Sequence, residues 1–169
     1  MPDPTKLVFF GIACTDEICI KYVKDHYPVD AHQACTSLGC APVLLACEKL
    51  AGNWLMVVMS ALSNYSMLYH CRGRYRLPRS LFVDMSKQLK NFHSAGFVHG
   101  DIRDTNIMVS PDRKKFMIID FDWAGKLGLV RYPLNVNKTI WRPDGMNSGE
   151  PIKAEHDMAM LKYSIAMMY

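Results

Sequence analysis

A short hairpin flanked by polar side chains constrains the fold of this chain more than any other feature of its sequence. Asp101 is followed five residues later by Asn106, and Asp120 comes at the end of the next pair of strands, predicted within 107–119. The turn Ser110-Pro111-Asp112 joins the two strands, because Pro and Asp are typical turn residues. The hairpin therefore folds Asp120 back beside Asn106 and gathers oxygen-bearing side chains at one place.

The first third of the chain predicts a small antiparallel sheet with one helix. Two apolar runs within 7–23 flank Thr15-Asp16-Glu17 and indicate a hairpin. The stretch 29–38 contains no Gly or Pro and is followed by a Gly, which favours a helix. Two buried strands are predicted at 43–47 and 54–59.

The remainder predicts helices on either side of a long irregular segment. Between Pro78 and Gly96, apolar residues recur on one helical face. They are Leu81, Phe82, Met85, Leu89 and Phe92. The stretch 123–151 is rich in turn residues, and a loop of that length is usually functional or disordered. A last helix is predicted at about 154–168.

Length and composition predict one ordinary folded domain. The chain has 169 residues, of which 50% are hydrophobic and 21% charged, enough apolar content for a core. The net charge of +4 is modest, and the arginines within 72–79 supply much of it. We expect these arginines to lie in a solvated loop, which argues against nucleic acid as a partner; an acidic partner or a nucleic-acid patch is the alternative reading.

The six cysteines predict buried thiols rather than a disulfide or zinc framework. No Cys-x-x-Cys pair or Cys/His ligand spacing occurs, and most of the cysteines lie among apolar neighbours. Reduced cysteine favours an intracellular compartment. The apolar run 7–14 is too short to span a membrane, so we interpret it as a strand and expect no membrane partner.

The polar segments resemble the catalytic loop and the metal loop of protein kinases. His99-x-Asp101-x-x-x-x-Asn106 matches the first loop, and Asp120-Phe121-Asp122 matches the second. Lys21 resembles the phosphate-pairing lysine of these enzymes. Pro143-Asp144 resembles the end of their activation segment, and Asp157 the aspartate that braces their catalytic loop. In detail the motifs are most similar to those of a group of fungal kinase-like proteins.

The resemblance implies an α+β, bilobal protein-kinase-like fold in partial form. It covers roughly residues 15–169 and implies a single domain 1–169, with 1–59 as a partial N-terminal lobe and 60–169 as a partial C-terminal lobe. No Gly-x-Gly-x-x-Gly loop occurs, so the first strand of the small lobe is expected to be absent, and the sequence stops in the helix of Asp157. We therefore expect a fragment of a longer protein or a degenerate kinase, with apolar faces that lower its stability or need partner surface.

The resemblance also gives each candidate residue a role in phosphoryl transfer that depends on ATP and Mg²⁺. Asp101 would orient and deprotonate the acceptor hydroxyl, and Arg103 would supply positive charge to the transferring phosphoryl group. The cofactor-binding and metal-binding residues complete the set: Lys21 on the phosphates, Asn106 and Asp120 on Mg²⁺, and Asp122 as a second carboxylate near the metal. Asp30 is the one acidic candidate for the partner of Lys21 on the helix 29–38; the alternative is that an apolar neighbour such as Ala34 faces the site instead.

Two loop positions differ from the pattern of many protein kinases. Gly100 stands where many carry the Arg that senses activation-loop phosphate, which argues against that form of regulation. Asp122 replaces the metal-loop Gly and so gives up easy access to positive φ. His99 is expected to pack and hydrogen-bond rather than to carry protons, and Trp123 either packs under the metal loop or contacts a substrate.

Three functions follow from the resemblance. The first is transfer of the γ-phosphate of ATP to a Ser or Thr hydroxyl of a protein substrate. The second is a catalytically inactive, pseudokinase-like module that binds nucleotide or a partner. The third is a small-molecule phosphotransferase of the aminoglycoside or choline type, which also carries His-Gly-Asp and Asp-Phe-Asp motifs. Arg103 favours the protein substrate, because the small-molecule enzymes often have His there.

Overall fold

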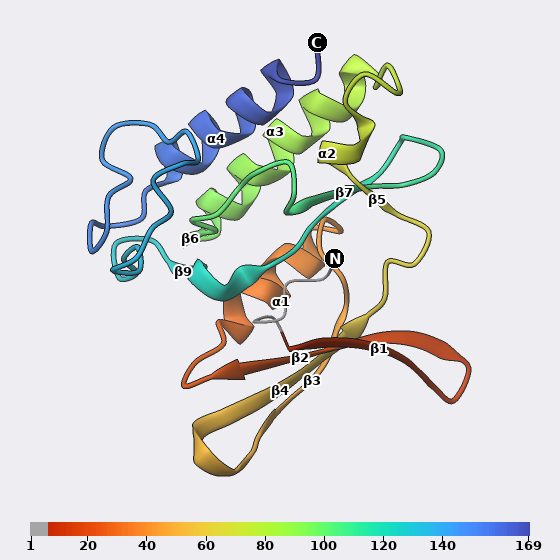
Figure 1. The fold of residues 1–169 in the computed structure, drawn as a ribbon, viewed down its shortest axis with the longest axis vertical. Coiled ribbons are helices and arrows are strands. Elements are labelled where there is room, and N and C mark those ends of the chain that lie inside the picture. Colours follow the sequence, from red (N-terminus) through yellow and green to blue (C-terminus); the bar gives the residue numbers. More distant parts are fainter. Residues whose placement is uncertain (1–6) are drawn as a thin grey trace.

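The computed structural model describes residues 7–169 and places an antiparallel sheet at one end of the molecule and two long helices at the other (Figure 1). One further helix, α1, lies between the sheet and the loops of the helical part (Figure 1). The chain first builds the sheet with α1 and then the helical part. The site predicted from the sequence therefore draws its residues from both ends of this arrangement.

The sheet has four antiparallel strands in the order β1-β2-β4-β3. The predicted hairpin within 7–23 and the two predicted buried strands are all present. Their bounds are β1 Val8–Ala13, β2 Asp16–Lys24, β3 Leu44–Lys49 and β4 Trp54–Ser60. A 3-10 turn, Ala51–Asn53, joins β3 to β4. Lys21 lies in the middle of β2, opposite Val57 of the inner strand β4, so its backbone is fixed on both sides.

Helix α1 (Val29–Ser37) packs one face inward through Ala31, His32 and Cys35. The His32 ring is fully buried and both of its nitrogens are satisfied. Nε2 donates to the carbonyl of Pro42 at 2.9 Å, and Nδ1 accepts from the hydroxyl of Tyr27 at 2.8 Å. Burial of the ring in a neutral, hydrogen-bonded state fixes the position of α1 against the rest of the chain.

The helical part is built on α3 (Arg79–Ser94), which follows Pro78 and ends before Gly96, as predicted. All five residues of its predicted apolar face are buried. α4 (Ala154–Ala166) packs beside α3, and the short α2 (Leu68–Cys71) precedes them. No helix within residues 7–169 combines the length and the apolar character needed to cross a membrane.

Two small sheets connect the helices to the loops. The predicted hairpin forms as β7 (Ile107–Val109) and β8 (Phe116–Ile118), and β5 (Ser66–Met67) extends it. β6 (Phe97–Val98) pairs with β9 (Gly125–Lys126), which belongs to the stretch expected to be irregular. β5, β6, β9 and α2 were not predicted from the sequence, because elements of two to four residues carry no readable periodicity.

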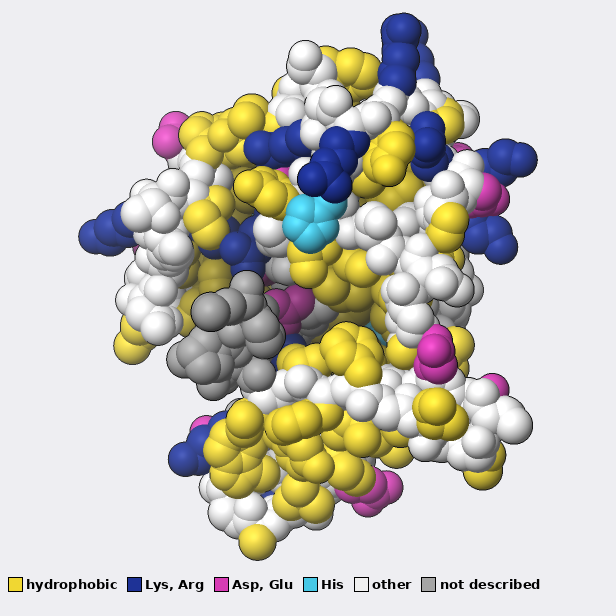
Figure 2. All heavy atoms as spheres, turned by 45° about the vertical axis from the view of Figure 1, so that its right-hand side comes forward, with side chains coloured by type: hydrophobic (Ala, Val, Ile, Leu, Met, Phe, Trp, Pro, Cys, Tyr) yellow, Lys and Arg dark blue, Asp and Glu magenta, His cyan; other side chains and the backbone are white. Residues whose placement is uncertain are grey.

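Several exposed apolar side chains lie on the sheet. Figure 2 shows hydrophobic side chains over the sheet at the bottom of that view. Phe10 and Ile12 of β1 are each 73% exposed, and Val43 and Leu45 near β3 are about half exposed. These side chains lie on or beside the two edge strands, β1 and β3, so exposed apolar surface follows both edges of the sheet.

All six cysteines are free thiols, but they differ in burial. Cys35, Cys40 and Cys71 are buried, Cys19 and Cys47 are partly buried, and Cys14 is exposed. The Sγ atoms of Cys35 and Cys40 lie 3.3 Å apart beside the end of α1. Buried thiols thus occur at half of the positions.

His32 should make the fold sensitive to acid. Burial, together with the charge of Lys21, lowers the pKa of His32 from 6.5 to about 4. Because the unfolded chain binds a proton at a higher pH than the folded chain does, stability is complete above pH 6.5 and is lost as pH falls toward 4. The full shift corresponds to about 3 kcal/mol. We expect urea unfolding to show this slope, and His32→Gln to reduce it.

The matched control is His26→Gln, since His26 is exposed and should leave the slope unchanged. Part of the slope should remain in His32→Gln, because burial also lowers the pKa of His156. A slope that is identical in His32→Gln and the unmodified protein would contradict this account.

Candidate active site

The loop 99–106 connects β6 to β7 and carries the predicted catalytic residues. It begins with a sharp turn at Gly100, whose φ is +81°. A Cβ at this position would lie 2.7 Å from Cδ1 of Ile152 and 3.3 Å from Cβ of Trp123. The left-handed backbone and this close contact explain why Gly stands here and why a long side chain such as Arg has no room.

Asp157 of α4 holds the start of this loop. Its carboxylate is fully buried and accepts the backbone N–H of His99 and of Gly100, each at 2.8 Å. The side chain of His93 approaches the same carboxylate at 3.1 Å. Asp157 therefore braces the start of the loop, which is the part that its resemblance implied. This one side chain ties α4 and α3 to the loop.

His99 is part of the loop's internal hydrogen bonding. Its Nδ1 accepts the backbone N–H of Asp101 at 3.2 Å, and its Nε2 faces the carbonyl of Ile119 at 3.2 Å. A ring protonated on Nε2 satisfies both contacts. His99 thus packs and hydrogen-bonds between the two loops, in agreement with its expected structural part.

Asp101 lies at the centre of a cluster of donors. Its Oδ2 accepts the side-chain amide of Asn106 at 2.8 Å and lies 3.1 Å from Nη2 of Arg103. Its Oδ1 lies 3.5 Å from Nη2 of Arg142. Asp101 is only 6% exposed, so these donors define nearly all of its surroundings. The structure brings together the predicted residues Asp101, Arg103 and Asn106.

The hairpin places Asp120 next to Asn106, as predicted. The N–H of Ile119 donates to the carbonyl of Asn106 at 3.0 Å, and Asp120 follows with φ +69°. The left-handed residue is thus Asp120 itself, and Asp122 lies in a short 3-10 turn that needs no positive φ. The replacement of the metal-loop Gly by Asp122 therefore strains no backbone here.

Phe121 anchors this second loop. Its ring is buried, stacks on His32 of α1 with centroids 4.5 Å apart, and meets His99 edge to face at 5.0 Å. The side chain thus connects α1, the metal loop and the catalytic loop. It fixes Asp120 and Asp122, which flank it, relative to both ends of the molecule.

Lys21 reaches from the sheet to these two carboxylates. Its Nζ lies 2.7 Å from Oδ1 of Asp120 and 2.5 Å from Oδ1 of Asp122. Burial disfavours the ammonium, but the carboxylates of Asp120 and Asp122 outweigh this and raise the pKa of Lys21. Lys21 therefore stays cationic and joins the sheet to the metal loop.

The structure does not bring Asp30 to this cluster. Asp30 lies exposed on α1, and no ion pair within residues 7–169 joins it to Lys21. The pairing of Lys21 with Asp30 expected from the sequence is corrected to Asp120 and Asp122. Spacing along the chain identified an acidic residue on the right helix but could not determine which face it occupies.

One side chain of the long loop, Arg142, completes the cluster and was not assigned a role from the sequence. Arg142 approaches Asp101, and its guanidinium lies over the ring of Trp123 at 5.2 Å from the centroid. Trp123 also contacts Tyr132 edge to face. Arg142 lies in a segment without periodicity, where only its position between Trp141 and Pro143 sets it apart.

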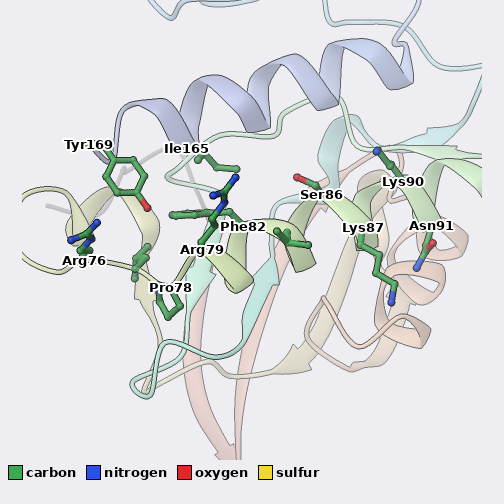
Figure 3. Close-up of a pocket in the computed structure, with 12 residues that line it drawn as sticks. Arg76, Pro78, Arg79, Phe82, Ser86, Lys87, Lys90, Asn91, Ile165 and Tyr169 are labelled. Carbon is green, nitrogen blue, oxygen red and sulfur yellow. The ribbon is translucent and has the colours of Figure 1, made fainter.

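A large surface groove lies away from this cluster, along α3 and the end of α4. It has a volume of about 1090 Å³. Figure 3 shows its cationic rim of Arg76, Arg79, Lys87 and Lys90 and the apolar side chains of Phe82 and Ile165. None of the site residues predicted from the sequence lines it. The groove and the cluster of carboxylates and Lys21 are therefore separate sites on the chain.

Comparison with known proteins agrees with this geometry. A family model, described as the lipopolysaccharide kinase (Kdo/WaaP) family, matches residues 40–128, just over half of the chain and including both polar loops. The chain belongs to this family. Membership confirms the kinase-like resemblance of the loops and places the Asp101 and Asp120 segments within the matched region.

Two viral kinases are also similar to the chain. Serine/threonine-protein kinase 1 of African swine fever virus is 25% identical over 127 residues, which is 71% of this chain and 42% of that protein. The chain thus spans about two fifths of the length of this curated relative. The structure of the Cydia pomonella granulovirus kinase PK-1 matches 98% of this chain and 67% of that chain, with a TM-score of 0.78 and 14% identity. This likeness confirms the partial, α+β kinase-like fold.

Gly100→Ala should destabilise the protein through the turn that Asp157 holds. We expect a loss of about 2–5 kcal/mol, since a left-handed Ala costs about 1–2 kcal/mol and overpacking against Ile152 adds about 1–3 kcal/mol. The control is Gly128→Ala, because Gly128 also has positive φ but has nothing within 4 Å of its Cβ position. Urea unfolding measures both. Equal losses in the two variants would exclude the contact with Ile152 as the cause.

Proposed function

We propose that the chain transfers the γ-phosphate of ATP to a Ser or Thr hydroxyl of a protein. One observation carries the proposal: the hairpin and Phe121 bring the Asp101 loop beside a lysine and two carboxylates that come from the sheet and the metal loop. Phosphoryl transfer needs a carboxylate at the acceptor hydroxyl, a cation for the phosphates and oxygen ligands for a metal. The cluster contains each of these groups.

Asp101 acts on the acceptor in this proposal. Its carboxylate orients the hydroxyl and takes its proton as the hydroxyl oxygen bonds to the γ-phosphorus and the bond from that phosphorus to ADP breaks. Asn106 holds Oδ2 of Asp101 in place through its 2.8 Å hydrogen bond. Arg103 is positioned at the same oxygen and supplies positive charge to the phosphoryl group as it moves.

The residues present fit a magnesium ion. Asp120 and Asp122 direct one oxygen each at the same ammonium, so their carboxylates converge on one point that favours a cation. Within residues 7–169, no group of three or more His, Cys, Asp and Glu side chains is arranged to hold a metal. Mg²⁺ does not require one, because it commonly uses one or two carboxylates together with phosphate oxygens and water. Asn106, Asp120 and Asp122 would hold it, and it would neutralise phosphate charge.

Lys21 is the proposed phosphate ligand. In the structure it neutralises Asp120 and Asp122, and it remains charged at neutral pH because those carboxylates raise its pKa. Asp120 and Asp122 would hold the metal ion when it is bound, and Lys21 would then neutralise the charge of the nucleotide phosphates. Asp30, which lies exposed on α1, takes no part in this exchange.

A sugar hydroxyl is a second candidate acceptor. The family match favours it, since that family is described by its lipopolysaccharide kinases. The viral relative, described as a serine/threonine-protein kinase, favours the protein acceptor.

The expected closeness to fungal kinase-like proteins and the division into lobes at residues 59 and 60 remain predictions.

The test is transfer of labelled γ-phosphate to mixed protein substrates and, separately, to lipopolysaccharide. Asp101→Asn should lower the rate by about 10²–10⁴, the usual contribution of a positioned general base. Asp84→Asn is the control, because Asp84 is an exposed carboxylate on α3. Transfer that is unchanged in Asp101→Asn would refute the assignment. Stabilisation by ATP without any transfer would indicate a binding module instead.

A further inference from the structure

The side chain of Arg142 is placed at the catalytic carboxylate but is poorly satisfied there. It is only 8% exposed, and its Nε and Nη1 have no hydrogen-bond partner among the described residues. Its one ion pair within residues 7–169, to Oδ1 of Asp101, is long at 3.5 Å. Two unpaired donors on a buried guanidinium favour the binding of an anion, because the hydrogen bonds that they lost to water have not been replaced by bonds within the protein.

Arg142 contacts the oxygen of Asp101 that Asn106 and Arg103 do not use. Asn106 and Arg103 both contact Oδ2, whereas Arg142 contacts Oδ1. Oδ1 is therefore the oxygen left for an acceptor hydroxyl. A hydroxyl that approaches Oδ1 meets Arg142 first and must displace its weak contact.

The backbone around Arg142 is fixed, so the side chain is the part free to change partner. The neighbouring Trp141 stacks on Tyr163 of α4 with centroids 4.4 Å apart. On the other side, the N–H of Met146, itself buried, donates to the carbonyl of Pro143. The guanidinium of Arg142 lies over the ring of Trp123, and a cation is attracted to the face of an aromatic ring. This contact can hold the guanidinium near the site while its hydrogen bonds pass from Asp101 to another anion.

We propose that Arg142 leaves Asp101 and binds a carboxylate or phosphate of the acceptor peptide next to the hydroxyl to be phosphorylated. This rests on the proposed transfer to proteins and gives that reaction a specificity: acidic or already phosphorylated peptides are the preferred acceptors. The exchange pairs Nη2, released from Asp101, and one of the two unpaired donors with the anion, and it frees Oδ1 of Asp101 for the hydroxyl. A planar guanidinium suits both anions, because each presents two oxygens to its paired N–H groups.

The test compares fluorescently labelled peptides that contain one Ser flanked by Asp, by phosphoserine or by Asn. Binding is measured by anisotropy at fixed ionic strength without ATP. The Asp and phosphoserine peptides should bind the full chain at least about tenfold tighter than the Asn peptide, the factor of one charge-assisted hydrogen bond. The preference should fall to about one in Arg142→Gln and be partly retained in Arg142→Lys.

Arg131→Gln is the matched control, because Arg131 is an exposed arginine of the same loop that donates only to the carbonyl of Gly149 among the described residues. It removes the same charge and should keep the preference. Equal binding of all three peptides, or a preference that survives in Arg142→Gln, overturns the proposal. Binding of none of the peptides overturns it as well.

A transfer assay with the same peptides separates this inference from the proposed function. In Arg142→Gln, KM for the acidic peptide should rise at least about tenfold while KM for ATP stays unchanged. Transfer to all peptides at equal efficiency would leave the kinase assignment intact and refute the role of Arg142. Acid-selective, Arg142-dependent binding without any transfer would support the anion site and refute the kinase assignment.

Discussion

The buried carboxylate of Asp157 is the interaction on which the candidate site depends. It accepts two successive backbone N–H groups, at His99 and Gly100, and so determines the direction in which the chain leaves β6. A carboxylate buried without such donors would be costly, whereas here the loop satisfies it and is fixed in return. The direction of the turn also positions Asp101, because Asp101 follows Gly100 directly and already lies inside the cluster. Gly100 is the only residue type that fits the turn without strain, given the closeness of Ile152.

A second constraint aligns the two ends of the molecule. Phe121 is packed between His32 of α1 and His99 of the catalytic loop, and the residues on either side of it, Asp120 and Asp122, both reach Lys21 of the sheet. Packing and charge therefore act on the same short segment. A shift of α1 would move Phe121 and with it both carboxylates. In this arrangement the position of a helix outside the cluster controls whether the lysine, the two carboxylates and Asp101 lie together.

Much of this could be predicted from the sequence, and the exceptions have physical causes. The face of α3 was readable because five apolar residues follow the helical period, and Asn106 and Asp120 were placed together because a tight hairpin leaves no other geometry. The ion-pair partner of Lys21 could not be predicted, because Asp30 and the two loop carboxylates are all candidates and only the packing of the folded chain decides between them. Arg142 was missed because its loop has no period and its contact to Asp101 spans 41 positions of sequence. Local patterns thus determine elements and hairpins, while long-range ion pairs depend on the assembled fold.

The most direct test of this account is calorimetric titration of the full chain with a non-hydrolysable ATP analogue, with and without Mg²⁺. If Lys21, Asp120 and Asp122 form the nucleotide and metal site, Mg²⁺ should tighten binding of the analogue, and Asp120→Asn should remove most of that gain because the ion loses a carboxylate. Asp84→Asn should behave like the unmodified protein. Binding of the analogue that is independent of Mg²⁺, or that gains as much from Mg²⁺ in Asp120→Asn, would contradict the account.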